Sequence, residues 1–313
     1  MTAQEARAAN AAHARRQIAF PVLFVLLWST GFIAAKYGLP YAPPFTFLFY
    51  RFVLVAALMA IVALATRAPW PDTPMAVLHI AVSAWLVHGI YLGGVFIALK
   101  GGMPAGTSAM LVGLQPILTV AIARLWLRER VVPRQWIGLA LGVAGVWFVV
   151  RHRLGFGDGM QGLLPSALAL VGISVGTLWQ KRFCARVDLR SGAVIQFAAC
   201  AVVYLPLVAL FEGGPVQWTS EFVFALGWSV VVLSVGAISL LYWMLRHGAA
   251  ADVARLFFLV PAVTAILAFV VFAETLDALA IAGMVSIAIG VALARPKARA
   301  TAPSAASADP PVP

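Results

Sequence analysis

Three side chains that could contact a solute lie three residues apart in one apolar stretch: Trp85, His88 and Tyr91. Residues at this spacing share a face of an α-helix. An imidazole inside an apolar span is costly unless it faces water or a hydrogen-bond partner. The pattern therefore predicts a stripe that lines a pore; the alternative is a histidine bonded to a neighbouring helix, with both aromatic rings packed. Ser239 and Tyr242, also three apart, are predicted to line a cavity in the same way.

A second polar feature is Gln115, directly before Pro116 in another apolar stretch. Proline lacks a backbone N–H, so it frees a carbonyl one turn earlier and bends the helix. The free carbonyl and the amide side chain could bind a polar solute, or the kink could serve packing alone. Pro261 repeats the kink, but the apolar Val260 precedes it.

Two tryptophans stand beside glycines in related stretches, Trp28 near Gly31 and Trp179 near Gly176. An indole can stack on an aromatic solute or cap a cavity. The glycines allow helices to approach closely or leave room for a ligand. Both tryptophans are therefore candidate solute contacts; a place in the aromatic belt at the membrane interface is the alternative, and it suits Trp179 better.

Charged residues gather at the ends of the apolar stretches. Glu129 and Glu274 sit beside turns, where each could accept backbone N–H groups from the next helix start or pair with an arginine. Arg51 and Arg255 lie inside helices but within about two turns of an end, so their side chains are expected to reach the headgroups. For Arg255 the alternative is contact with a solute carboxylate. A gating or structural role is predicted for Gly31, Pro116, Gly176, Pro261, Glu129 and Glu274.

The composition places these residues in a membrane. The chain has 313 residues, of which 63% are hydrophobic and 11% charged, with a mean hydropathy of +0.96. A soluble domain carries about 25% charged residues, so lipid must be the solvent for most of the surface. Stretches of about 17 to 25 apolar residues are long enough to span a bilayer. Ten are predicted, over 18–36, 44–65, 75–99, 104–126, 134–150, 160–182, 190–211, 221–245, 251–273 and 277–294.

The sequence repeats itself at an offset of 145 residues. The matching pairs are Ser29 and Ser174, Gly31 and Gly176, Lys36 and Lys181, Phe52 and Phe197, Pro116 and Pro261, Thr119 and Thr264, Glu129 and Glu274, Gly138 and Gly283, and Gly145 and Gly290. The first half holds five helices, so the second half enters the membrane from the other side. The predicted fold is an all-α integral membrane protein, with ten transmembrane helices as two inverted five-helix repeats around a central cavity.

The basic residues set the expected orientation. With the N-terminus in the cytoplasm, the opposite side holds only Lys36, Lys100, Arg151 and Arg153, and positive residues remain inside. The formal charge of +11 has this cause, so nucleic acid is not an expected partner. The domains expected are a disordered cytoplasmic N-terminus (1–17), repeats at 18–150 and 160–294, a connecting loop (151–159) and a disordered cytoplasmic tail (295–313).

Together these motifs resemble a known family. Trp28-Ser-Thr-Gly31-Phe, Pro116 followed by Glu129, and the glycine-rich fifth helix are similar to the drug/metabolite transporter superfamily, in its ten-helix branch of two EamA-type domains. The resemblance covers residues 18–294. It is greatest to the bacterial inner-membrane exporters of aromatic and other amino acids. It implies a cavity lined by helices 1, 3, 4, 6, 8 and 9, with helices 5 and 10 at the periphery.

The function predicted is export of small organic solutes, chiefly amino acids including aromatic ones, by alternating access across a bacterial inner membrane. No Asp or Glu falls in the middle of a span, which favours uncoupled facilitated transport over coupling through His88. The alternatives are a multidrug exporter of lipophilic cations and a lipid-modifying enzyme, for which His152 and Asp158 are the nearest candidate pair. No enzymatic activity, cofactor or metal site is expected. The expected partners are a small-molecule solute and the lipid bilayer, with the chain a monomer or a weak homodimer.

Overall fold

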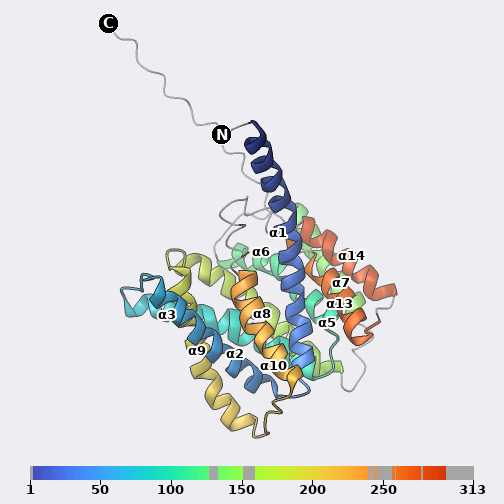
Figure 1. Ribbon diagram of the computed structural model, residues 1–313. Coiled ribbons are helices and arrows are strands. Elements are labelled where there is room, and N and C mark those ends of the chain that lie inside the picture. The colour runs from blue at the N-terminus through green and yellow to red at the C-terminus, as the bar shows by residue number, and fades with distance from the viewer. Residues whose placement is uncertain are drawn as a thin grey trace.

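A computed structural model describes residues 3–126, 133–150, 159–238, 240, 244, 256–257, 259–275 and 278–293 of the chain (Figure 1). All regular structure in these ranges is helical. Seven described helices are long and apolar enough to cross a membrane: Ala19–Gly38, Pro44–Ala65, Pro74–Lys100, Ala105–Trp126, Gly162–Phe183, Leu189–Phe211 and Ser220–Ala237. Three shorter apolar helices cover Trp136–Gly145, Val260–Phe272 and Ile281–Gly290. Each of these segments overlaps one of the ten predicted spans and exceeds its bounds by at most two residues, so the all-α membrane fold is confirmed.

Some spans consist of more than one helical segment. The first half contains α1 (Ala3–Gly38), α2 (Pro44–Ala65), α3 (Pro74–Ala84), the π-helix η1 (Trp85–Ile90), α4 (Tyr91–Lys100), α5 (Ala105–Val112), α6 (Gln115–Trp126) and α7 (Pro133–Val150). The second half contains α8 (Gly159–Phe183), α9 (Leu189–Phe211), α10 (Ser220–Gly227), the π-helix η3 (Trp228–Ala237), α13 (Val260–Phe272) and α14 (Ala278–Leu293).

The first described helix extends beyond the first predicted span, into the segment 1–17 for which disorder is predicted. Helix α1 begins at Ala3 and continues without a break into the first span. Ala, Gln, Glu and Arg dominate this segment, and all are strong helix formers. A helix already nucleated by the apolar span extends through them at little cost. The tail at 295–313 lies outside the described residues.

The contact between α7 and α14 reveals the relation between the halves. A Cβ added at Gly145 would lie 2.7 Å from the Gly283 oxygen, and one added at Gly290 would lie 2.5 Å from the Gly138 oxygen. As α7 advances from Gly138 to Gly145, α14 therefore runs back from Gly290 to Gly283. Because these glycines are repeat mates, the two halves are inverted with respect to each other. This small-residue stripe packs within the chain.

The other helix contacts are related by the same two-fold symmetry, which exchanges the two halves. Helix α2 packs against its repeat mate α9, and α5 against α13, which belongs to the repeat mate of its span (Figure 1). The contact of α8 with α3 and η1 has its counterpart in the contact of α1 with α10 and η3. The contact of α1 with α13 corresponds to that of α6 with α8. Each half thus completes the packing of the other.

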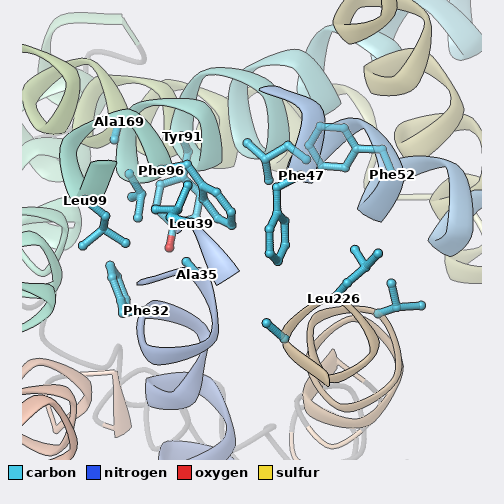
Figure 2. Close-up of a cluster of buried hydrophobic side chains, with 14 of the residues drawn as sticks. Phe32, Ala35, Leu39, Phe47, Phe52, Tyr91, Phe96, Leu99, Ala169 and Leu226 are labelled. Carbon is cyan, nitrogen blue, oxygen red and sulfur yellow. The ribbon is translucent and has the colours of Figure 1, made fainter. Parts of the chain in front are cut away.

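Phenylalanines fill the interior near the end of the bundle where α2 begins and α4 ends, which we call the predicted outer end. Phe47 packs on Phe96 at 5.1 Å and on Phe222 at 5.5 Å between ring centroids. All three side chains are fully buried, and Figure 2 shows Phe47 and Phe96 within the cluster that also holds Phe52 and Tyr91. At the same end, the Glu212 carboxylate, directly after α9, accepts the first backbone N–H groups of α2. This end is therefore tightly packed.

The repeat-related glycines Gly31 of α1 and Gly176 of α8 give a matched test of how closely α8 packs on η1. A Cβ at Gly176 would lie 2.6 Å from Val87 Cγ2 and 2.8 Å from Leu86 Cβ, whereas one at Gly31 would meet Leu233 Cδ1 at an ordinary 3.6 Å. We expect Gly176→Ala to lower the free energy of unfolding by about 1–3 kcal/mol because η1 must move. Gly31→Ala should be nearly neutral. Thermal unfolding of the purified protein in detergent measures both, and equal effects would contradict the close contact of α8 with η1.

Candidate functional site

Polar side chains from several spans meet inside the bundle. We call Arg51, His88, Tyr91, Gln196 and Ser234 the central polar cluster; they come from α2, η1, α4, α9 and η3 respectively. Arg51 and Gln196 each stand seven residues, or roughly 10 Å along the helix, from the start of their spans. Those spans enter from opposite ends, so the two residues flank the middle of the bundle.

His88 bonds to the second half of the chain. Its Nε2 lies 3.4 Å from the Gln196 amide oxygen, and its ring stacks on Phe197 with centroids 4.6 Å apart. The Gln196 amide nitrogen in turn donates to the Ser83 hydroxyl at 3.3 Å. Trp85 also bonds to α9, where its indole N–H donates to the Ala199 oxygen at 3.1 Å. Both side chains thus face α9.

Tyr91 departs from the predicted stripe. Residues Trp85 to Ile90 form a π-helix, whose i→i+5 hydrogen bonds widen the turn, so a spacing of three no longer keeps side chains in line. Tyr91 is 9% exposed and points into the apolar cluster, while Trp85 is 37% exposed (Figure 2). Tyr91 therefore faces a different part of the bundle from Trp85 and His88, which both face α9.

Arg51 is buried, which corrects the expectation that it reaches the headgroups. The residue is 8% exposed. One terminal nitrogen donates to the Ser234 hydroxyl at a long 3.5 Å, and the buried Nε has no hydrogen-bond partner in the part of the chain that the structure describes. Packing of α2 against α9 and η3 holds the side chain inside the bundle.

The cluster follows the internal repeat. Gln196 stands 145 residues after Arg51, and the repeat mate of η1, residues 230–235, falls within η3. Arg51 bonds to η3, and Gln196 bonds to η1. π-Helical turns inside α-helices are frequent at functional sites. Gln196 and Ser234 were not among the predicted site residues, although the offset of 145 placed a polar residue opposite Arg51.

The fourth span breaks where a kink is predicted. Helix α5 ends at Val112, α6 begins at Gln115, and Gly113 and Leu114 form the break just before Pro116. The Gln115 amide nitrogen donates to the Thr177 hydroxyl of α8 at 3.0 Å. Gln115 is thus held by the sixth span at the level of the break.

In the ninth span the described helix α13 begins at Val260, the repeat mate of Gln115. Pro261 stands in the first turn of α13, and its ring lies against the break in the fourth span, because a Cβ added at Gly113 would meet Pro261 Cγ at 3.0 Å. The fully buried Ser29 donates to the Val260 oxygen at 3.3 Å. The two proline sites therefore meet between the halves, each tied to one of the repeat-related helices α1 and α8.

The two tryptophans proposed as solute contacts lie apart from each other. Trp28 packs with Phe24 and Phe257, at centroid distances of 5.3 and 5.1 Å. Trp179 lies near the C-terminal end of α8, where its indole N–H donates to the His79 oxygen at 3.2 Å. The predicted residues Ser239, Tyr242 and Glu129 lie outside the described residues, as do Arg255, His152 and Asp158.

Glu274 joins three segments at the predicted outer end. Its carboxylate forms an ion pair with Lys36 at the end of α1, and it accepts the backbone N–H of Ala105, the first residue of α5, at 3.0 Å. The Lys36 ammonium lies 5.2 Å from the centre of the Phe272 ring. The predicted partner was an arginine or the start of the next helix, whereas the observed partners are a lysine and the start of the fourth span. These partners could not be predicted from nearby residues, because they belong to the other half of the chain.

Comparison with known proteins places the chain among membrane transporters. Residues 16–151 and 160–295 each match the EamA-like transporter family. The chain is 29% identical to the uncharacterized transporter YvbV of Bacillus subtilis, over 88% of this chain and 90% of that protein. It is 26% identical to a probable amino-acid metabolite efflux pump of Salmonella typhimurium, over 86% and 91%.

Two further comparisons concern a named exporter and a solved fold. The chain is 29% identical to a probable terminal-alkyne amino-acid exporter of Streptantibioticus cattleyicolor, over 84% of this chain and 87% of that protein. One crystal structure with 22% identity shares the fold, with a TM-score of 0.60 over 88% of this chain and 94% of that one.

Removal of the Glu274 carboxylate tests its role in joining the three segments. Because Glu274→Ala leaves Lys36 and the α5 amide without their acceptor, we expect it to lower the free energy of unfolding by about 1–3 kcal/mol. Asp72→Ala, which removes an exposed carboxylate from a loop, is the matched control and should have little effect. Thermal unfolding followed by tryptophan fluorescence compares the two, and equal midpoints would refute a structural role for Glu274.

Proposed function

Because the chain belongs to the EamA-like transporter family, we propose that it exports small organic solutes, chiefly amino acids including aromatic ones, across a bacterial inner membrane by alternating access. Membrane transport follows from the family. The solute class is suggested by relatives named as amino-acid exporters.

The observation that carries the proposal is the meeting of polar groups from two inverted halves inside the bundle. The central polar cluster takes Arg51 and His88 from the first half and Gln196 and Ser234 from the second. In inverted-repeat carriers the solute binds at mid-depth between the repeats, and rocking of one repeat against the other opens each side in turn. The break at Gly113 in the fourth span supplies irregular backbone at the same interface, where it lies against Pro261 of α13.

The chemistry of the site suits an amino acid with an apolar side chain. The half-exposed indole of Trp85 and the ring of Phe197 offer apolar walls beside His88. The imidazole and the Gln196 amide offer hydrogen bonds to the polar end of the solute. A few directional polar groups among apolar walls are typical of small-molecule sites.

Transport is proposed to be uncoupled. The sequence has no Asp or Glu in the middle of a span, so buried carboxylates of the kind used by proton-driven carriers are absent from it. His88 is the alternative proton carrier in the central polar cluster.

A transport assay tests this function directly. Purified protein in liposomes without an ion gradient should carry several amino acids, aromatic ones among them, down their concentration gradients. Loss of both the indole and the imidazole in Trp85→Ala/His88→Ala should reduce the flux by more than about 10-fold, since solute contacts contribute roughly 1–3 kcal/mol each. Trp70→Ala, in an exposed loop, is the matched control.

Two results of this assay would contradict the proposal. Flux that requires a pH difference would overturn uncoupled transport, while leaving the carrier itself in place. A chain that moves none of the amino acids would overturn the solute class.

The proposed orientation has both termini in the cytoplasm. Gly214 lies in the open loop between α9 and α10 at the predicted outer end, and Asp72 lies in the exposed loop before α3. A membrane-impermeant maleimide should label Gly214→Cys in intact cells, and Asp72→Cys only after the cells are opened. The native cysteines Cys184 and Cys200 are buried, so the unmodified protein gives the background. The reverse pattern would invert the assignment.

A further inference from the structure

The feature that the proposed function leaves unexplained is a buried cation inside the bundle. Arg51 is 8% exposed, yet one terminal nitrogen reaches only a hydroxyl at 3.5 Å, and its buried Nε has no partner among the described residues. A guanidinium retains its proton in proteins, so it cannot escape this environment by becoming neutral. A buried charge is costly unless it is paired and hydrogen-bonded.

Among the residues that the structure describes, no carboxylate forms an ion pair with Arg51. All eleven acidic residues lie at or beyond the ends of the ten apolar stretches. The described ion pairs, Lys36 with Glu274 and Arg190 with Asp188, lie at the two ends of the bundle. The charged partner that Arg51 lacks must therefore come from outside the chain.

The surroundings of Arg51 define where such a partner would lie. Ser234 is its hydrogen-bond partner, and the adjacent Phe52 packs on Phe197, whose ring in turn stacks on His88. The repeat-related position holds the neutral Gln196, whose amide is already engaged with His88 and Ser83. The positive charge is thus confined to one half, beside the groups proposed to contact the solute.

We infer that Arg51 binds the carboxylate of the exported solute, an inference that rests on the proposed function and makes it more specific. Guanidinium and carboxylate match in shape and can form two parallel charge-assisted hydrogen bonds. Solutes with a free carboxylate, such as α-amino acids, are accepted. The corresponding amides and amines lack the negative charge and are rejected, as are lipophilic cations.

The test compares an acid with its amide. Liposomes containing the full-length protein are assayed with L-phenylalanine and L-leucine and with their amides, for the unmodified protein and for Arg51→Gln. This variant copies the polar side chain of the repeat mate and removes the charge. We expect the preference for acid over amide to fall about 10- to 100-fold, the range of one charge-assisted interaction. A purely structural role would reduce the transport of both solutes equally.

Two further variants make the test robust. Arg51→Lys keeps the charge without the planar fork, so it should retain part of the preference and replaces Arg51→Gln if that variant does not fold. Arg67→Gln removes an exposed arginine and should leave the preference unchanged. Stabilisation against heating by L-phenylalanine, but not by its amide, gives a second readout that does not depend on transport.

The outcomes separate the two claims. Amino-acid flux with an acid preference that persists in Arg51→Gln would overturn the role of Arg51 and leave the proposed function standing. Absence of flux, together with stabilisation by L-phenylalanine that Arg51→Gln abolishes, would overturn the transport proposal and support the carboxylate site. Absence of both flux and stabilisation would overturn both.

Discussion

In lipid, every backbone N–H and C=O group must find its partner within the protein, and this constraint governs the whole structure. It restricts the described spans to helices and confines irregular backbone to places covered by other helices. The break at Gly113 and Leu114 lies against Pro261, and the buried Ser29 hydroxyl bonds to the Val260 oxygen on the facing span. The interruption in the fourth span therefore lies at the interface between the halves, where the other half covers it.

The two-fold relation explains why this interface contains the candidate site. Helices that pack on their own repeat mates, α2 on α9 and α7 on α14, hold the halves antiparallel. The same relation brings η1 to α9 and η3 to α2. Polar residues on α2 and α9 thus meet the π-helical turns of the opposite half, and the central polar cluster is assembled from both repeats.

Much of the fold could be predicted from the sequence because it depends on periodic or repeated signals. Apolar length indicated the ten spans, and Pro116 located the break in the fourth span, against which the repeat mate Pro261 packs. The site was harder to predict. The helical spacing of Trp85, His88 and Tyr91 assumed an α-helix, and the π-helix turns Tyr91 toward a different neighbour. Arg51 near a helix end resembled an interfacial residue, because its burial depends on how α2, α9 and η3 pack. The Lys36 to Glu274 contact joins residues from opposite halves, so no local pattern indicates it.

Arg51 has a neutral residue, Gln196, at its repeat-related position, and this difference has an evolutionary consequence. Two identical five-helix subunits, assembled as an antiparallel dimer with two-fold symmetry, would place either two arginines or two glutamines on the facing helices. The first would set like charges against each other in a medium of low polarity, and the second would leave no charge. Fusion of the halves into one polypeptide allows a single positive group beside a neutral amide. Covalent linkage thus permits an electrical asymmetry that a symmetric ancestor could not possess.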